Sequence, residues 1–153
     1  MKTERKHGGP VPPVYFLLAL AGAIAAHKLA PAMQLINAPW NYAGILLIAA
    51  GLAMVIVSAG AFSRAETPIV PFTQSTALVT GGCYRFTRNP MYLGMVLVLL
   101  GVDVLLGSLT PFLILPVFVL IIHRVFILRE EAMLEELFGD EYRKFKGRIR
   151  RWL

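Results

Sequence analysis

The residues of this chain that could do chemistry lie in two groups, about 40 positions apart. The first group is the segment 82–94, with the sequence GCYRFTRNPMYLG. Asn89 before Pro90 is typical of a helix start, because Asn caps free amide groups and Pro fits the first helical position. A helix start is positively polarised, and Arg85 and Arg88 add charge to it. The segment therefore predicts a helix N-terminus that could bind an anionic group, such as a cofactor carboxylate.

The second group is the acidic pair Glu130-Glu131, which follows the last long apolar stretch. The pair could be solvated charge on a surface helix, which is the usual meaning of an acidic run. Helical spacing, however, places both Glu130 and Glu131 on the side of Leu134. We therefore expect at least one carboxylate to point toward the apolar side. Beside Arg124 and Arg129, it could orient a substrate or accept a proton.

Asp103 is a further ionisable residue, and it lies inside an apolar stretch where a charge is costly. Such a residue is a functional candidate. Its place toward the outer end of the stretch favours a simpler interpretation, which is snorkelling to the interface or pairing with Lys28 or His27.

The histidines and the cysteine predict neither a metal centre nor a disulfide. His7, His27 and His123 have no spacing with cysteines or carboxylates that would suggest metal ligands. His123, beside Arg124, could still contribute to a polar pocket. Cys83 is the single cysteine, so an internal disulfide is excluded.

Composition indicates that these groups belong to a membrane protein. Of the 153 residues, 57% are hydrophobic and 16% are charged, against about a quarter charged in ordinary soluble proteins. The apolar residues form long runs, and the charges gather between them, as a bilayer requires. The formal charge of +6 forms no basic stripe interleaved with aromatic residues. Lipid headgroups and topology explain it better, so no nucleic-acid partner is expected.

Four apolar segments predict an all-α, polytopic membrane fold with about four transmembrane helices. The first begins near Val14, and we expect His27 and Lys28 to shorten or kink it. The others cover 42–62, 91–109 and 111–128. A short turn joins the last two into a helical hairpin, which brings the two chemical groups close together.

The tail from Arg129 to about Ile149 predicts a C-terminal amphipathic helix, since apolar residues recur there at helical spacing with charges on the other side. We expect it to lie against the bundle or the headgroups. The chain is expected to be a single domain over 1–153. Its N-terminal two-helix region covers 1–79, and the cofactor-binding and catalytic region covers 80–153.

Basic residues predict the orientation of the segments. They lie before the first helix, between the second and third, and in the tail, and the outer loops have almost none. Outside the tail they are Lys2, Arg5, Lys6, Arg64, Arg85 and Arg88. By the positive-inside rule, both termini and the active site of this integral membrane protein are expected in the cytoplasm.

The two groups together resemble a known family. The patterns Gly-x-Tyr-x-x-x-Arg-Asn-Pro-Met-Tyr-x-Gly and Glu-Glu-x-x-Leu-x-x-x-Phe-Gly-x-x-Tyr, in this order, are similar to the isoprenylcysteine carboxyl methyltransferase and phospholipid methyltransferase superfamily. The resemblance covers roughly 80–153. It implies a membrane methyltransferase that uses S-adenosylmethionine from the cytosol and a lipophilic or lipidated substrate from the bilayer.

The resemblance also assigns roles to residues. With the neighbouring polar candidates, the expected cofactor-binding set is Tyr84, Arg88, Asn89, Pro90, Tyr92, Leu93, Gly94 and His123, and the expected catalytic set is Glu130, Glu131 and Arg124. No metal is expected. Asn89 stands where the best-known members have His, and because Asn has no titratable imidazole, a proton-transfer role there is not expected.

The acceptor stays open between two classes. We expect a carboxylate, as in isoprenylcysteine O-methylation, because it is already anionic and needs only positioning by Arg124 or Arg129. An amine, as in a phospholipid, must first lose a proton, for which Glu131 is suitable. The other interpretations are an NADPH-dependent sterol-type reductase and a non-catalytic membrane binding protein. Those reductases usually place an acid soon after the Tyr-x-Gly, where this chain has Met95 and Val96. The sequence does not predict an oligomeric state.

Overall fold

The computed structural model describes residues 11–69 and 75–153, and apart from its loops this part of the chain is helical. Within these ranges the β-structure is limited to one isolated bridge between Gln34 and Ser108. The prediction of an all-α fold is therefore confirmed. Four residues used in the sequence analysis lie outside the described ranges, namely Lys2, Arg5, Lys6 and His7.

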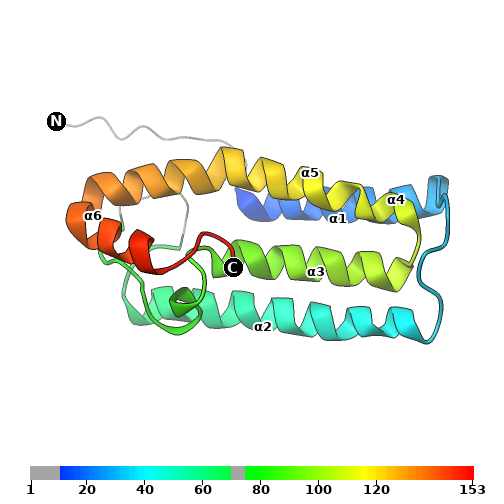
Figure 1. The fold of residues 1–153 in the computed structure, drawn as a ribbon, viewed down its shortest axis with the longest axis horizontal. Coiled ribbons are helices and arrows are strands. Elements are labelled where there is room, and N and C mark those ends of the chain that lie inside the picture. Colours follow the sequence, from blue (N-terminus) through cyan, green and yellow to red (C-terminus); the bar gives the residue numbers. More distant parts are fainter. Residues whose placement is uncertain (1–10, 70–74) are drawn as a thin grey trace.

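The described chain forms separate helices followed by one composite helical rod (Figure 1). The separate helices are α1 (Pro12–Leu29), α2 (Ala43–Arg64) and α3 (Pro90–Leu106). The rod consists of α4 (Leu109–Phe112), α5 (Ile114–Ile121), the π-helical turn η3 (Ile122–Ile127) and α6 (Leu128–Arg148). The short 3-10 turns η1 (Trp40–Tyr42) and η2 (Gly82–Arg85) precede α2 and α3.

Three helical stretches are long and apolar enough to cross a membrane, namely Pro12–Leu29, Trp40–Arg64 and Leu109–Arg148. The apolar part of the last one ends at Leu128, and polar residues begin at Arg129. Helix α3 is apolar but has only 17 residues, about 26 Å of helix. Leu18 on α1 and Leu46 on α2 are 66% and 74% exposed, which suits contact with lipid.

The first helix ends directly after His27 and Lys28 and is shorter than α2, as expected, but it has no kink. Helix α1 runs unbroken over 18 residues and carries both side chains in its last turn. Positive charge is favourable at a helix C-terminus. Nδ1 of His27 lies 2.8 Å from Oγ of Ser108, so the ring has a polar partner instead of lipid.

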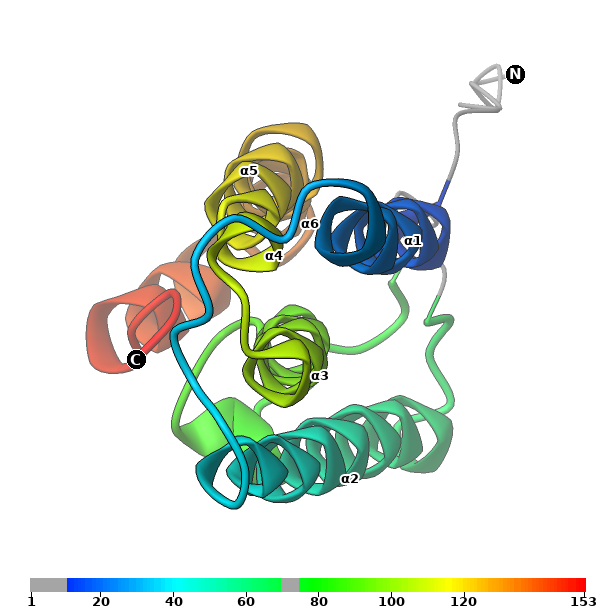
Figure 2. The same ribbon diagram turned by 90° about the vertical axis from the view of Figure 1, so that its right-hand side faces the viewer.

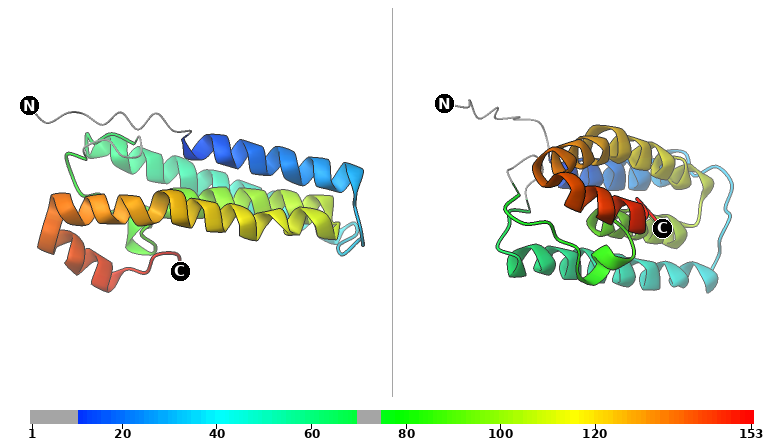
Figure 3. Two further views of the ribbon diagram at one scale, coloured as in Figure 1. Left: turned by 90° about the horizontal axis from the view of Figure 1, so that it is seen from above. Right: turned by 60° about the vertical axis from the view of Figure 1, so that its left-hand side comes forward.

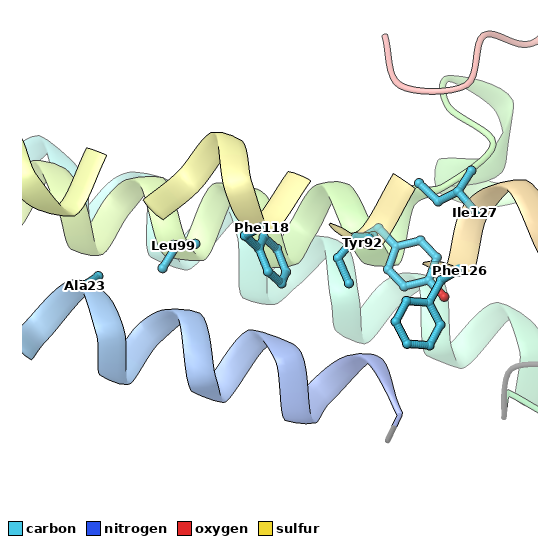
Figure 4. Close-up of a cluster of buried hydrophobic side chains, with 7 residues drawn as sticks. Ala23, Tyr92, Leu99, Phe118, Phe126 and Ile127 are labelled. Carbon is cyan, nitrogen blue, oxygen red and sulfur yellow. The ribbon is translucent and has the colours of Figure 1, made fainter. Parts of the chain in front are cut away.

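Helix α3 is the centre of the bundle. The end-on view shows α2 on one side of it, and α1 and α5 on the other (Figure 2). The buried core lies on the α1 and α5 side, where Leu99 of α3 joins Ala23 of α1 and Phe118 of α5 (Figure 4). Phe126 and Ile127 continue this cluster toward one end of the molecule. The packing of three elements on α3 fixes its position.

On the other side of α3, two pairs of glycines let its backbone touch that of α2. Gly51 lies opposite Gly94, and Gly44 lies opposite Gly101. A methyl group added at Gly94 would meet the carbonyl oxygen of Gly51 at 2.7 Å, and one at Gly101 would meet that of Gly44 at 2.6 Å. Small residues commonly let transmembrane helices approach closely, and this contact is of that kind. We call the two glycine pairs the glycine seam.

The end of the bundle opposite the two chemical groups is held by polar contacts to the turn after α3. Gly107 ends α3 with φ of 72°, a conformation that favours glycine, and its carbonyl accepts hydrogen bonds from Leu35 and Ile36. Asp103 is fully buried nearby, and neither of its carboxylate oxygens has a hydrogen-bond partner among the described residues. The predicted pairing of Asp103 with Lys28 or His27 is therefore wrong, because Lys28 is exposed and His27 bonds to Ser108.

The amphipathic helix expected for the tail is α6, and it has two features that were not predicted. It is continuous with the preceding apolar helix through the π-helical turn η3, and it bends at Gly139, whose φ is 49° and ψ −120°. After the bend the chain turns back toward the start of α3 (Figure 3). Glycine adopts this positive φ without the steric cost that other residues have.

The start of α1, the end of α2, the start of α3 and helix α6 all lie at one end of the bundle (Figure 1). The hairpin therefore brings segment 82–94 and the pair Glu130-Glu131 together, as the sequence predicted. These four elements surround the candidate site.

Candidate functional site

A cavity of about 320 Å³ opens between these four elements. Its wall is mainly apolar, with contributions from the start of α1, the end of α2 and the adjoining loop. Most of its polar side chains come from the two predicted groups, namely Tyr84, Arg88, Asn89, Tyr92, Glu130 and Glu131, and Ser75 and Tyr142 also line it. A mostly apolar pocket with a few convergent polar groups is the usual form of a small-molecule site.

Glu130 forms a hydrogen-bonded pair with Tyr92 inside this cavity. The hydroxyl of Tyr92 donates to Oε1 of Glu130 at 2.7 Å. Burial raises the pKa of Glu130 from 4.5 to about 7, and the bond from Tyr92 limits the rise. Burial, helped by the neighbouring Glu130, also raises the pKa of Tyr84. Glu130 therefore exchanges a proton near neutral pH, which is the property required of a general base.

Glu131 is held by two guanidinium groups. Arg151 donates from Nε and Nη2 to the two carboxylate oxygens, at 2.9 and 2.8 Å. Nη2 of Arg88 lies 3.2 Å from Oε1. Burial alone would raise the pKa of Glu131, but the hydrogen bonds from Arg151 and the charges of both arginines outweigh it, so the pKa is lowered. The adjacent glutamates thus differ, since Glu131 stays ionised and Glu130 titrates near neutrality.

Arg88 is only partly used by these contacts. Its side chain is 8% exposed, and it lines the cavity. Nε and Nη1 have no hydrogen-bond partner among the described residues. Because buried donors are nearly always satisfied, these two atoms indicate a place for an anionic or hydrogen-bond-accepting group of a ligand.

Asn89 lies at the helix start, as predicted, with Pro90 in the first turn of α3. Its side chain makes no capping hydrogen bond, however, so that part of the prediction is wrong. Instead Nδ2 donates to the carbonyl of Arg151 at 2.9 Å, and Oγ1 of Thr87 donates to the same carbonyl at 3.1 Å. The amide is used to hold the C-terminal segment.

Five other residues of the expected site do not line the cavity. Pro90 and Leu93 are buried in the packing of α3, and Gly94 belongs to the glycine seam. Arg124 is exposed on the π-helical turn, and His123 has a buried Nδ1 without a hydrogen-bond partner among the described residues. The cofactor-binding and catalytic roles assigned to these five residues stay predictions.

Sequence reasoning missed the contribution of the C-terminal segment and of the first helix. Arg151 and Thr87 bond to residues of the predicted site, and Val11 and Pro12 line the cavity. The sequence predicted no role for Arg151, Val11 or Pro12. A contact between residues 62 positions apart has no local periodicity to indicate it.

Comparison with known proteins gives three matches and one absence. The family model for phospholipid methyltransferase matches residues 40–141. An uncharacterized protein of Haemophilus influenzae is 46% identical over 63 residues, which are 41% of this chain and all of that protein. Protein-S-isoprenylcysteine O-methyltransferase of Schizosaccharomyces pombe is 36% identical over 75 residues, 47% of this chain. The match spans only 30% of the length of that relative. No solved structure matches the chain.

Proposed function

Because the chain belongs to the phospholipid methyltransferase family, we propose that its cavity binds S-adenosylmethionine and is the place of methyl transfer to a lipophilic acceptor. The observation that carries this proposal is the cavity itself. It combines an apolar wall with a buried, incompletely bonded Arg88 and a proton-accepting Glu130. An active site facing the cytoplasm, expected from the basic residues, is part of the proposal.

The side chains of the cavity fit this cofactor. Among the described residues, Nε and Nη1 of Arg88 have no hydrogen-bond acceptor, and such buried donors suit a carboxylate group. The apolar wall suits a flat base. When bound, S-adenosylmethionine supplies a methyl group on a positively charged sulfur, which is open to in-line displacement.

The protein's own part is to align the acceptor, exclude water and remove a proton where one must leave. Burial of the cavity between four elements supplies the exclusion of water. Of these, the alignment of donor and acceptor contributes most to the rate, because it replaces a random encounter between two molecules. Glu130 holds any proton that the acceptor loses, and Tyr92 orients its carboxylate.

The charges in the cavity favour an acceptor that loses a proton, such as a lipid amine. Among the described residues that line it, Arg88 is the only cation. If Arg88 binds the cofactor, a carboxylate acceptor would meet Glu130 without a positive partner. Arg124 and Arg129, which were expected to position a carboxylate, are exposed and do not line the cavity. Glu130, in contrast, is placed for the proton of an amine.

A carboxylate acceptor is the second candidate. The relative from Schizosaccharomyces pombe is a protein-S-isoprenylcysteine O-methyltransferase by name, and its match includes close to half of this chain. In that case Arg88 would bind the acceptor rather than the cofactor, and Glu130 would have to be protonated to avoid repulsion. The pKa of about 7 allows that state in mildly acid conditions.

The test is a transfer assay in detergent with S-adenosylmethionine labelled in its methyl group. Lipid amines and prenylated cysteine derivatives are offered in parallel. Mild alkali releases methanol from a methyl ester and leaves an N-methyl group in place, so label that resists alkali identifies the amine. Alkali-labile product establishes the carboxylate candidate. Folded protein that neither binds the labelled donor nor transfers its methyl group would refute the proposed function.

A further inference from the structure

The C-terminal segment makes a set of contacts with the predicted site that the family resemblance does not explain. The carbonyl of Arg150 accepts a hydrogen bond from the backbone amide of Arg88 at 2.9 Å. The carbonyl of Arg151 accepts from Asn89 and Thr87, and Trp152 packs against the hydrophobic core. These backbone contacts place the side chain of Arg151 against helix α6.

Arg151 and Arg88 both bind Glu131, and Arg151 makes the more extensive contact. Its guanidinium donates to both oxygens of Glu131, at 2.9 and 2.8 Å, whereas Arg88 approaches one oxygen with one nitrogen, at 3.2 Å. A carboxylate that accepts a bidentate arginine has most of its strong bonding positions occupied. Nε and Nη1 of Arg88 therefore keep no hydrogen-bond partner among the described residues, and the Arg88 side chain lines the cavity.

We propose that Arg151 is a positioning residue for the cofactor, which acts by satisfying Glu131 so that Arg88 remains available to the ligand. Without the Arg151 side chain, Glu131 would draw Arg88 into a bidentate pair, since both groups are buried and 3.2 Å apart already. The two free nitrogens would then be lost to the cavity. This inference rests on the proposed function, because it assumes that Arg88 binds the cofactor.

The experiment is a double-mutant cycle read by calorimetric titration of the full-length, detergent-purified protein with S-adenosylmethionine. Arg151→Gln keeps the backbone contacts and removes the guanidinium. We expect it to weaken binding about tenfold. In the double variant Glu131→Gln with Arg151→Gln, no carboxylate remains to capture Arg88, so we expect affinity within about threefold of the wild type. Arg151→Lys retains a positive partner for Glu131 and should be intermediate.

Arg143→Gln is the matched control. Arg143 also lies near the C-terminus and pairs with acids, Asp140 at 2.7 Å and Glu135, but its side chain is 57% exposed. Its loss should leave affinity unchanged. Thermal unfolding of every variant verifies that the protein is folded, and Arg151→Lys replaces Arg151→Gln if the latter does not fold.

Recovery of affinity in the double variant supports the inference, because a purely structural role of Arg151 predicts additive loss. Wild-type affinity in Arg151→Gln would overturn it, and so would a double variant that binds as weakly as the single one. The proposed function fails in a different way, by a wild-type protein that does not bind S-adenosylmethionine, and the inference then falls with it.

Discussion

The two sides of helix α3 are built on opposite principles. Toward α2, the glycine seam brings backbone against backbone, and a single methyl group would collide there. At its start, α3 borders a cavity of about 320 Å³ in which charged and hydroxyl side chains meet. The side that faces α2 is closely packed and presents no side chain for chemistry. The other side packs into the buried core along most of its length, and at its start it borders the cavity that holds the polar groups of the candidate site.

The comparison shows how a short chain can hold a polar site in a membrane bundle. Gly94 follows Pro90 by one helical turn, so the seam begins directly beside the residues that line the cavity. Close backbone packing leaves α3 no room to slide. The seam therefore fixes the helix start on which Arg88 and Asn89 depend, and the cavity can remain open without loss of geometry.

The strongest expected effect is on the cavity side. Glu130→Gln removes the proton acceptor, and we expect transfer to an amine to slow by about 100-fold or more. Affinity for the cofactor should change less than twofold. Single-turnover rates measured with bound donor separate these effects. Glu136→Gln is the control, since Glu136 is an exposed acid on the same helix. Equal rates for the two variants would remove Glu130 from the mechanism.

The seam is tested by Gly94→Ala. The added methyl would meet the carbonyl of Gly51 and Val55, both at 2.7 Å, so we expect a loss of about 2 to 3 kcal/mol in the free energy of unfolding. At Gly147 nothing lies within 4 Å, and Gly147→Ala should be neutral or should stabilise helix α6 by up to about 1 kcal/mol. Denaturation in mixed detergent micelles measures both. If Gly94→Ala weakened cofactor binding at full stability, the division between the two sides would be wrong.

Glu130 in the cavity should make the free energy of unfolding depend on pH. The pKa of Glu130 is raised from 4.5 to about 7, so the folded protein holds its proton more tightly than the unfolded chain. Its contribution is present below pH 4.5 and is lost as pH rises to about 7, and we expect about 1 to 2 kcal/mol between pH 5 and 8. The pKa of Glu131 is lowered, so this residue changes the free energy of unfolding only in more acid solution. Wild type should lose this stability at pH 8, and Glu130→Gln should not. The same loss in both would contradict the assignment.

The smallest expected effect is the loss of one asparagine side chain, which can be compared between the two ends of the bundle. Asn89 donates to the carbonyl of Arg151, and at the far end Asn41 donates to that of Leu105 at 3.1 Å. Replacing either by Ala removes one hydrogen bond and should cost about 1 kcal/mol of stability. Only Asn89→Ala should also weaken cofactor binding, by about fivefold. Calorimetry on both variants decides whether the predicted role of Asn89 is specific to the cavity end.

Much of the fold could be predicted because lipid imposes long apolar runs. The segment 42–62 became α2 almost without change. The segment 91–109 was predicted too long, because α3 ends at Leu106 and Gly107 follows with a positive φ. The bend at Gly139 and the π-helical turn were missed, since each depends on a few backbone angles that leave the apolar spacing nearly intact. Asp103 was misjudged because burial of an unpaired acid has no mark in the sequence.

The candidate site was predictable to the extent that it depends on the hairpin. Because the two helix ends are adjacent, Arg88 had to lie near Glu131, and the two side chains are 3.2 Å apart. The division of labour between Glu130 and Glu131 was not predictable, because it depends on Arg151, which returns to the site through a bend and a loop. Long-range contacts of this kind follow from tertiary packing and not from local spacing.

The π-helical turn at Ile122–Ile127 gives the rod an angular offset. Each α-helical residue advances about 100°, so one extra residue in a wide turn rotates everything beyond it by that angle. Phe126 and Ile127, which lie in this turn, are both buried. Deleting one residue here and restoring a regular helix would swing Glu130 and Glu131 around the rod axis together. The π-helical turn thus sets the direction in which the acidic pair points relative to the packed face of the apolar stretch.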